Sequence, residues 1–128
     1  MKKLSTRAHA ILDYVVGGAM MTLPRMMGWS PRVMRLFTAA GGGTIIYSLM
    51  TKYELGALRV LPMKAHLAMD AVSGAALIGS DLMLEDKDRA ARAALIGAGV
   101  FEIVVAVMTK TTSPVEAAER VDAVLPTH

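Results

Sequence analysis

The sequence predicts an all-α integral membrane protein with four transmembrane helices, and three observations support this fold class. Of the 128 residues, 54% are hydrophobic, and these gather in four blocks with most charged residues between them. Such segregation is unlike the composition of an ordinary soluble domain. Each block is close to the ~20 residues that a helix needs to cross the hydrocarbon of a bilayer. A motif that occurs twice further predicts two equivalent helical hairpins within a single domain.

The four expected helices follow one another with short links. They run from Arg7 to Leu23, from Val33 to Met50, from Met63 to Leu84 and from Ala90 to Thr109. The first is the most polar of the four and is expected to stop at Pro24. In the link that follows, Trp29 stands where an indole ring would lie at the membrane surface.

The end of the chain differs in character from the four blocks. Residues 111–128 form a polar tail, in which Ser113 and Pro114 predict the start of a short surface helix that reaches about Val124.

The basic residues predict how the helices are oriented. With four spans both termini share one side, and eight Lys and Arg residues lie near that side against six on the other. The eight are Lys2, Lys3, Arg7, Lys52, Arg59, Lys64, Lys110 and Arg120, and the six are Arg25, Arg32, Arg35, Lys87, Arg89 and Arg92. Because cytoplasmic loops carry an excess of basic residues, cytoplasmic termini are expected.

The duplicated motif contains two ionisable residues. Ala8-His9-Ala10-Ile11-Leu12-Asp13, followed by Gly17, returns 57 positions later as Ala65-His66-Leu67-Ala68-Met69-Asp70, followed by Gly74. The similarity extends over about residues 7–52 and 64–110, where Met50-Thr51-Lys52 matches Met108-Thr109-Lys110. Two hairpins in the same orientation imply a pseudo-twofold axis along the membrane normal.

The pattern His-x-x-x-Asp-x-x-x-Gly, followed by an apolar run, a short break and a second helix rich in small residues, resembles the SPW-repeat membrane proteins. The resemblance covers most of residues 7–112. Where that family places Ser-Pro-Trp, this chain has Leu23-Pro24-Arg25 and Ser80-Asp81-Leu82. The resemblance implies a small protein of two helical hairpins in a prokaryotic inner membrane. It implies no activity and no catalytic residues.

Polar side chains within the expected helices mark the candidate site, because ionisable groups are costly there unless they face a partner. His9 and Asp13 lie one helical turn apart on one face, and His66 and Asp70 copy that arrangement. Helices that alternate in direction place further polar residues at a similar depth. The expected layer contains His9, Asp13, Thr44, Tyr47, His66, Asp70 and Glu102.

The sequence leaves several roles open for this layer. The aspartates could accept hydrogen bonds that fix helix register, or the layer could conduct protons or ions. Zn²⁺, Mn²⁺ or iron could bind to His9, Asp13, His66 and Asp70, and haem could bind between the two histidines. Cysteine is absent, so thiolate ligands are excluded.

Glycines on the expected helices predict that helix backbones approach closely. The glycines expected to pack in this way are Gly17, Gly41, Gly42, Gly43, Gly74, Gly97 and Gly99.

Motifs and charge narrow the function classes. The chain has no phosphate-binding loop, nucleophile elbow or His-Glu-x-x-His motif, so an enzyme is not expected. The net charge of +3 is small and the basic residues form no single stripe, which argues against nucleic-acid binding.

The sequence favours a structural or accessory component without a cofactor. It would lie in the lipid bilayer and pack with itself or with a larger membrane complex. The alternative is a proton or ion pathway, or a metal-binding or haem-binding membrane protein. A soluble helical bundle also stays open because the first block is polar.

Overall fold

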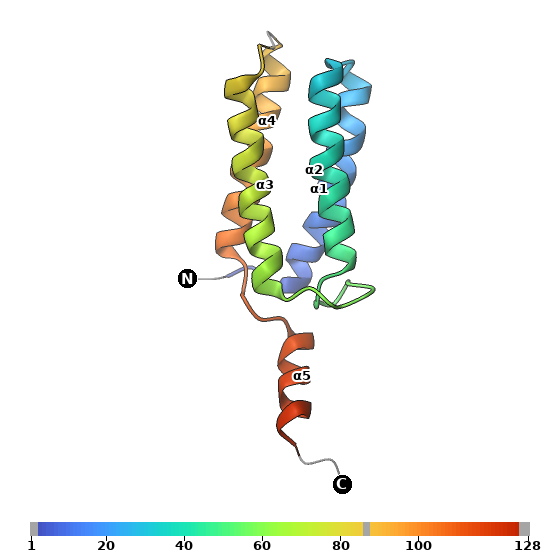
Figure 1. Ribbon diagram of the computed structural model, residues 1–128, viewed down its shortest axis with the longest axis vertical. Coiled ribbons are helices and arrows are strands. Elements are labelled where there is room, and N and C mark those ends of the chain that lie inside the picture. Colours follow the sequence, from blue (N-terminus) through green and yellow to red (C-terminus); the bar gives the residue numbers. More distant parts are fainter. Residues whose placement is uncertain (1–2, 86–87, 126–128) are drawn as a thin grey trace.

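A computed structural model describes residues 3–85 and 88–125, and in these residues the chain is all-α (Figure 1). The described helices are α1 (Thr6–Met27), α2 (Pro31–Leu49), α3 (Met63–Met83), α4 (Arg89–Met108) and α5 (Pro114–Val124). The prediction of four long helices and a short last one is confirmed. Two residues in the charge argument, Lys2 and Lys87, lie outside the described residues.

The long helices form two antiparallel hairpins, α1 with α2 and α3 with α4 (Figure 1). Helix α5 lies beyond the end of the bundle at which the chain begins (Figure 1). Among the described helices, α4 is the one that is long and apolar enough to cross a membrane by length and composition.

Helices α1, α2, α4 and α5 begin after residues whose side chains accept hydrogen bonds from the first turn, where backbone N–H groups lack helical partners. Helix α3 begins after Pro62 and has no such side-chain cap. Ser5 accepts from Ala8, and Ser30 accepts from Val33. In α5 the Ser113 hydroxyl and the Glu116 carboxylate each bind the other residue's backbone N–H.

Helix α1 continues past its predicted end, through Pro24 to Met27. A proline in the last turn removes one backbone hydrogen bond but does not block the turn that follows it. Gly28 then ends the helix in the left-handed conformation with φ of 66°, and the Trp29 N–H donates to the Pro24 carbonyl oxygen at 3.1 Å. Glycine, not proline, therefore sets the end of α1.

The sequence suggested that Trp29 lies at the membrane surface, but the structure buries it within the protein. It is 5% exposed, and its ring centroid lies 5.9 Å from that of Phe37. It belongs to an apolar core at the end of the bundle where α1 ends and α4 begins. This core contains Met20, Trp29, Val33, Phe37, Leu77, Ala91 and Leu95. At the opposite end, Ala10, Tyr53, Met63, Leu67 and Ala106 form a second core.

Glycine pairs allow the helices of each hairpin to approach closely. A Cβ atom on Gly41 would lie 2.5 Å from the Gly17 carbonyl oxygen, and one on Gly99 would lie 2.4 Å from that of Gly74. No larger residue fits these crossings without a backbone shift.

Close packing does not explain the other three glycines that the sequence singled out. A Cβ on Gly42 would meet only the Met21 sulfur at 3.9 Å, and one on Gly43 or Gly97 would meet nothing within 4 Å.

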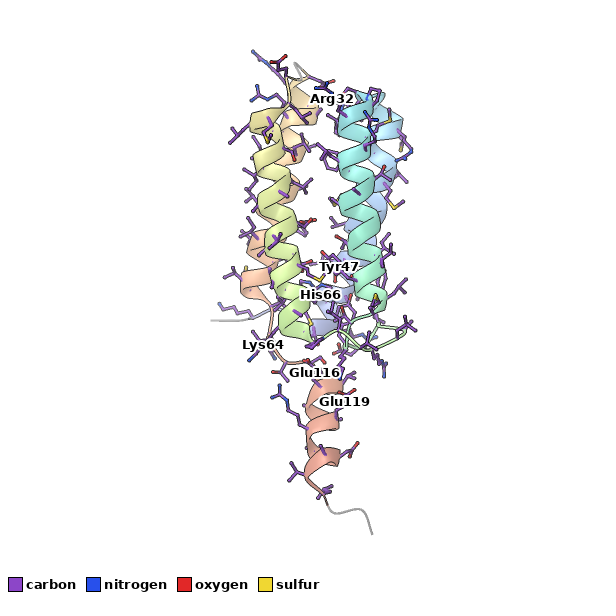
Figure 2. All side chains as sticks on the ribbon, viewed as in Figure 1. Arg32, Tyr47, Lys64, His66, Glu116 and Glu119 are labelled. Carbon is purple, nitrogen blue, oxygen red and sulfur yellow. The ribbon has the colours of Figure 1, made fainter. Side chains whose placement is uncertain are left out.

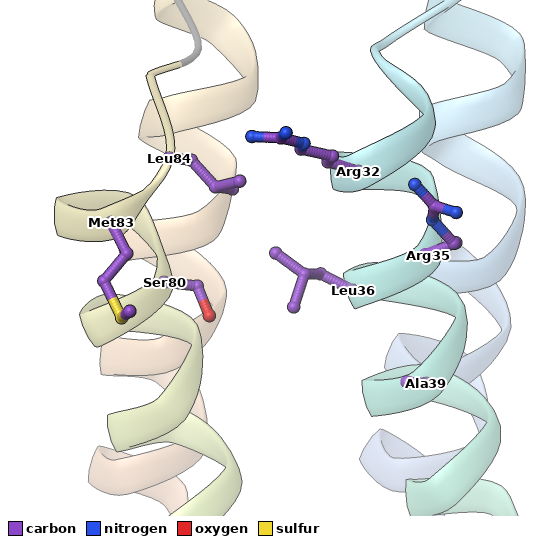
Figure 3. A pocket seen from close by; sticks show the side chains of 7 residues that line it. All are labelled: Arg32, Arg35, Leu36, Ala39, Ser80, Met83 and Leu84. Carbon is purple, nitrogen blue, oxygen red and sulfur yellow. The ribbon is translucent and has the colours of Figure 1, made fainter.

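The two hairpins leave open space between α2 and α3. A pocket of about 370 Å³ lies between the start of α2 and the end of α3, with Arg32 and Arg35 at its rim (Figure 3). A second, of about 450 Å³, lies further along the same two helices and reaches Tyr47. The hairpins therefore meet loosely along this face, and the polar contacts described below join them.

Candidate metal centre

Four ionisable side chains from α1 and α3 meet inside the bundle, between the two hairpins. His9 and Asp13 are on α1, His66 and Asp70 are on α3, and each is 7% exposed or less. The four-residue spacing puts each His and Asp pair on one helical face, and these two faces are turned toward each other. Figure 2 places His66 beside Tyr47 in the space between the hairpins.

Two imidazole nitrogens and two carboxylates surround one small volume. The Nε2 atoms of His9 and His66 are 3.1 Å apart. His9 Nε2 lies 3.2 Å from Asp13 Oδ1 and 2.9 Å from Asp70 Oδ2. His66 Nε2 lies 3.1 Å from Asp13 Oδ2 and 3.3 Å from Asp70 Oδ2. One ligand atom from each of these residues lies within 4.8 Å of all the others.

The hydroxyl of Thr109 determines which nitrogen of His9 carries hydrogen. Thr109 Oγ1 donates its one hydrogen to the Val105 carbonyl oxygen at 2.6 Å. It also lies 2.7 Å from His9 Nδ1. Because its hydrogen is already engaged, the hydroxyl can only accept from this nitrogen, so Nδ1 is the N–H donor.

Thr51 does the same for His66. Its Oγ1 donates to the Tyr47 carbonyl oxygen at 2.6 Å and accepts from His66 Nδ1 at 2.7 Å. Each histidine is thus bound by a threonine from the opposite hairpin, and the two contacts are equivalent in the repeat.

This pattern leaves a lone pair on each Nε2 atom when the imidazoles are neutral. The two lone pairs then face each other at 3.1 Å and also face two carboxylates. Four acceptors without a hydrogen between them repel one another, and a cation among them removes the repulsion. Metal-binding histidines have this same arrangement, in which the second ring nitrogen donates to an outer partner.

The distances and the charge both suit a divalent metal ion. A tetrahedral site with bonds of about 2.0–2.2 Å has ligand atoms about 3.3–3.6 Å apart. The separations from each Nε2 atom to the other nitrogen and to the nearest carboxylate oxygens are 2.9–3.3 Å, and Asp13 approaches the two histidines with different oxygens. A set with one ligand atom from each residue lies within 4.8 Å, so the side chains must close around the ion. Two carboxylates with two neutral imidazoles balance a charge of 2+, which keeps the buried site neutral.

The Asp70 carboxylate is oriented by residues of α2. Tyr47 Oη donates to Asp70 Oδ1 at 2.5 Å, and Thr44 Oγ1 lies 3.2 Å from the same tyrosine oxygen. Asp70 Oδ2 therefore remains the oxygen that faces both histidines.

The Asp13 carboxylate is oriented by the first hairpin and its loop. Tyr53 Oη donates to Asp13 Oδ2 at 2.9 Å, and Ser48 Oγ donates to the same oxygen at 3.2 Å. Burial and the adjacent Asp13 carboxylate raise the pKa of Tyr53, so this phenol stays protonated and remains a donor.

The loop between α2 and α3 folds back tightly to bring Tyr53 to the site. A Cβ on Gly56 would lie 1.8 Å from the Thr51 carbonyl oxygen, so only glycine fits this turn. The loop is also attached to α1, since Tyr14 Oη donates to the Leu55 carbonyl oxygen at 2.8 Å.

Glu102 lies beside the cluster and not within it. Its side chain is buried on α4, and neither carboxylate oxygen makes a well-formed hydrogen bond with a described residue, although the Ser73 hydroxyl is close enough to interact. It lines a small enclosed cavity whose other walls include His9, Asp13 and Asp70.

Sequence reasoning identified the histidines, the aspartates, Tyr47 and Thr44 but missed four of their partners. The missed residues are Ser48, Thr51, Tyr53 and Thr109. The repeated Met-Thr-Lys tripeptide was the available signal for the two threonines.

The arrangement does not suit haem between the two histidines. Axial ligands of a haem iron stand on opposite faces of a porphyrin, with the ring between them. Here the two Nε2 atoms are 3.1 Å apart, and Asp70 Oδ2 lies within 3.3 Å of both. No slot for a porphyrin separates them.

Comparison of the chain with protein-family models, with curated proteins and with solved structures gave no match. The fold and the site together define a four-helix bundle with a buried His₂Asp₂ cluster at the junction of its hairpins.

Proposed function

We propose that the protein binds one divalent transition-metal ion between its two hairpins, within a membrane. A single observation carries this proposal: two Nε2 atoms 3.1 Å apart face two carboxylates, while both Nδ1 hydrogens are engaged by threonines. A divalent cation would serve all four acceptors at once, whereas a proton on one Nε2 atom would serve only some of them.

Zn²⁺ fits the site best among the common ions. Its preferred donors are imidazole nitrogen and carboxylate oxygen as well as thiolate, and it takes four ligands in a tetrahedron. It also binds nitrogen and oxygen ligands more tightly than Mn²⁺ or Fe²⁺. The His9, Asp13, His66 and Asp70 cluster supplies four such donors, with no sulfur that would select Cu⁺.

Burial in this chain supports a membrane location, because polar groups lie inside the bundle and apolar groups outside. The four ionisable side chains of the cluster are buried. By contrast Val15, Ile46, Val72 and Val107, one on each long helix, are between 62% and 70% exposed. Large exposed apolar surfaces mark contacts with lipid or with other proteins.

The exposed charges lie near the helix ends, which supports the same proposal. On α2, Arg32 and Arg35 lie in the first turns, and the sequence from Leu36 to Thr51 contains no charged residue. Those residues span about 24 Å at about 1.5 Å each. The hydrocarbon core is about 30 Å thick, and long arginine side chains can reach its surface from just inside it. The charge distribution further supports cytoplasmic termini.

The hairpins are proposed to be related by a pseudo-twofold axis along the membrane normal. Equivalent contacts support this symmetry, since Leu4 pairs with Thr109 as Leu61 pairs with Thr51. Membership of the SPW-repeat proteins is proposed on the same two-hairpin arrangement. Association with a second copy or with a larger membrane complex, through the exposed apolar faces, also remains a proposal.

A proton pathway through the same residues is the second candidate, and it is favoured by the buried Glu102, whose oxygens make no well-formed hydrogen bond with a described residue. Carboxylates and histidines are the usual relay groups inside membranes. The two candidates predict different metal contents. A proton relay needs no bound metal, whereas the metal site holds one metal ion.

The test is a zinc titration of detergent-purified protein, with the bound metal measured by elemental analysis. We expect about one Zn²⁺ per chain in the wild type, bound much more weakly by His66→Ala and by Asp70→Ala. The matched control is Asp81→Ala, because Asp81 is a buried aspartate on the same helix that pairs with Arg92 at 3.0 Å, far from the cluster. It should keep its zinc. A helical wild type that binds no stoichiometric metal would contradict the proposal and leave the proton pathway.

A further inference from the structure

Glu102 is a buried carboxylate for which the bundle supplies no hydrogen-bond donor of good geometry. It is 7% exposed, and both of its oxygens lack a hydrogen bond to the described residues. Buried polar groups are almost always satisfied, and the nearby Ser73 hydroxyl has one hydrogen and can serve only one of the two oxygens. The other oxygen points to a water molecule or an ion beside it.

The cavity next to Glu102 has the size and the position for such a partner. Its volume of about 10 Å³ is near the smallest that holds one water molecule. Glu102 forms part of its wall, and His9, Asp13 and Asp70 form another part. A molecule in this cavity therefore lies between Glu102 and three of the four proposed metal ligands.

The two hairpins differ at this place, although they are otherwise equivalent. Allowing for the offset of the repeat, Glu102 on α4 stands where α2 has Thr44. Tyr47, which binds Asp70 from α2, has the apolar Val105 as its counterpart on α4. On the α2 side, the cluster is bound by the Tyr47 hydroxyl, which contacts that of Thr44. On the α4 side, it faces a cavity and the Glu102 carboxylate.

We propose that the metal ion takes a fifth, exchangeable ligand on the α4 side in addition to the four protein donors, a water molecule that donates a hydrogen bond to Glu102. This inference rests on the proposed metal site. Metal sites with an open position carry out chemistry on a bound small molecule, whereas structural sites use protein ligands alone. Glu102 is a positioning residue in this account.

The cavity also restricts what can replace the water. Leu12, Val16, Phe101 and Val105 line it together with the polar groups. The ligand that fits a volume of this size is a single water molecule. Larger anions are excluded by size and by the apolar walls.

The experiment uses full-length protein in detergent, loaded with Mn²⁺ and transferred to water enriched in oxygen-17. Electron–nuclear double resonance then detects oxygen-17 bound to the metal. We expect a coupling from bound water in the wild type and in Glu102→Gln, which retains an acceptor. We expect Glu102→Leu to bind Mn²⁺ but to lose this coupling. Gly97→Ala is the control on the same helix, because a Cβ at this position meets nothing within 4 Å.

Several results would overturn the inference, and they separate it from the metal site itself. Bound Mn²⁺ without oxygen-17 coupling in the wild type would show a closed site. Unchanged coupling in Glu102→Leu would show that Glu102 does not hold the water. A loss of Mn²⁺ affinity of tenfold or more in Glu102→Leu would make Glu102 a ligand. Failure of every form to bind Mn²⁺ or Zn²⁺ would overturn the metal site and the water with it.

Discussion

At the residue scale, two threonine hydroxyls determine what the histidines can do. Thr51 and Thr109 each use their one hydrogen on a carbonyl oxygen of their own helix, so each accepts from a histidine. The lone pairs of His9 and His66 are thereby directed to the same place. The chemistry of the site therefore depends on residues that bind no metal.

Removing one of these hydroxyls should weaken metal binding without removing a ligand. For Thr109→Val we expect zinc affinity to fall about 10- to 100-fold, as is usual when the outer partner of a ligating histidine is lost. Thr109→Ser keeps the hydroxyl and should bind zinc nearly as the wild type does. Competition with a chelating dye measures both constants, and equal affinity in the valine variant would contradict the tautomer argument.

Acidification should release the metal. Protons compete for both histidine Nε2 atoms and for both carboxylates, and each must be deprotonated to bind the ion. Zinc affinity should therefore fall as the pH is lowered. The stability that zinc gives should be lost in the same direction. Zinc titrations monitored at a series of pH values test this, and affinity independent of pH would exclude the histidines as ligands.

Much of the site could be predicted from the sequence, because one-turn spacing of His9 and Asp13 fixes their common face before any tertiary structure is known. The threonines could not be predicted in the same way. Thr51 and Thr109 follow the ends of α2 and α4, and each binds a histidine of the other hairpin. Tyr53 is on a loop, whose path depends on the tight turn at Gly56. Local periodicity does not determine such contacts.

At the element scale, helix crossings depend on the glycines that face each other. The apolar blocks predicted the helix bounds to within a few residues. Helix α1 extends beyond its predicted end because Gly28, and not Pro24, ends it. The sequence could not show which glycines lie at a close helix crossing. Gly41 faces Gly17, whereas Gly43 on the same helix faces open space. Their roles depend on which face of α2 meets α1.

Alanine should therefore act in opposite ways at two glycines of α4. Gly99→Ala puts a Cβ 2.4 Å from the Gly74 carbonyl oxygen and should destabilise the protein by about 1–3 kcal/mol. Gly97→Ala meets nothing within 4 Å and should be neutral or stabilising by up to about 1 kcal/mol, since alanine favours helix over glycine. Thermal unfolding in detergent, followed by circular dichroism, measures both. Equal destabilisation by both variants would contradict the close crossing.

At the scale of the whole molecule, the chain places polar groups at its centre and apolar groups on its surface. Composition alone marks only α4 among the described helices as a possible membrane span. Helices α1 and α3 carry the His and Asp pairs, which make them more polar on average although their outer faces are apolar. The polar residues of the site thus lower the mean hydropathy of the two helices that carry them.

The membrane proposal predicts how the protein partitions. After cell lysis without detergent it should stay with the membrane fraction, and an alkaline carbonate wash should not extract it. Side chains such as Ile46 and Val72 are exposed, and in the proposed arrangement they would contact lipid. A tagged soluble protein expressed alongside serves as the control. Recovery of folded protein in the aqueous fraction would favour a soluble bundle instead.

The central claim is that histidines from both hairpins bind one metal ion, and zinc-edge X-ray absorption of the zinc-loaded protein tests it most directly. The account predicts two imidazole ligands with the remaining donors oxygen, at about 2.0–2.2 Å, and no sulfur. In His9→Ala the imidazole count should fall to one. A spectrum without imidazole scattering, or one unchanged by loss of His9, would contradict the account.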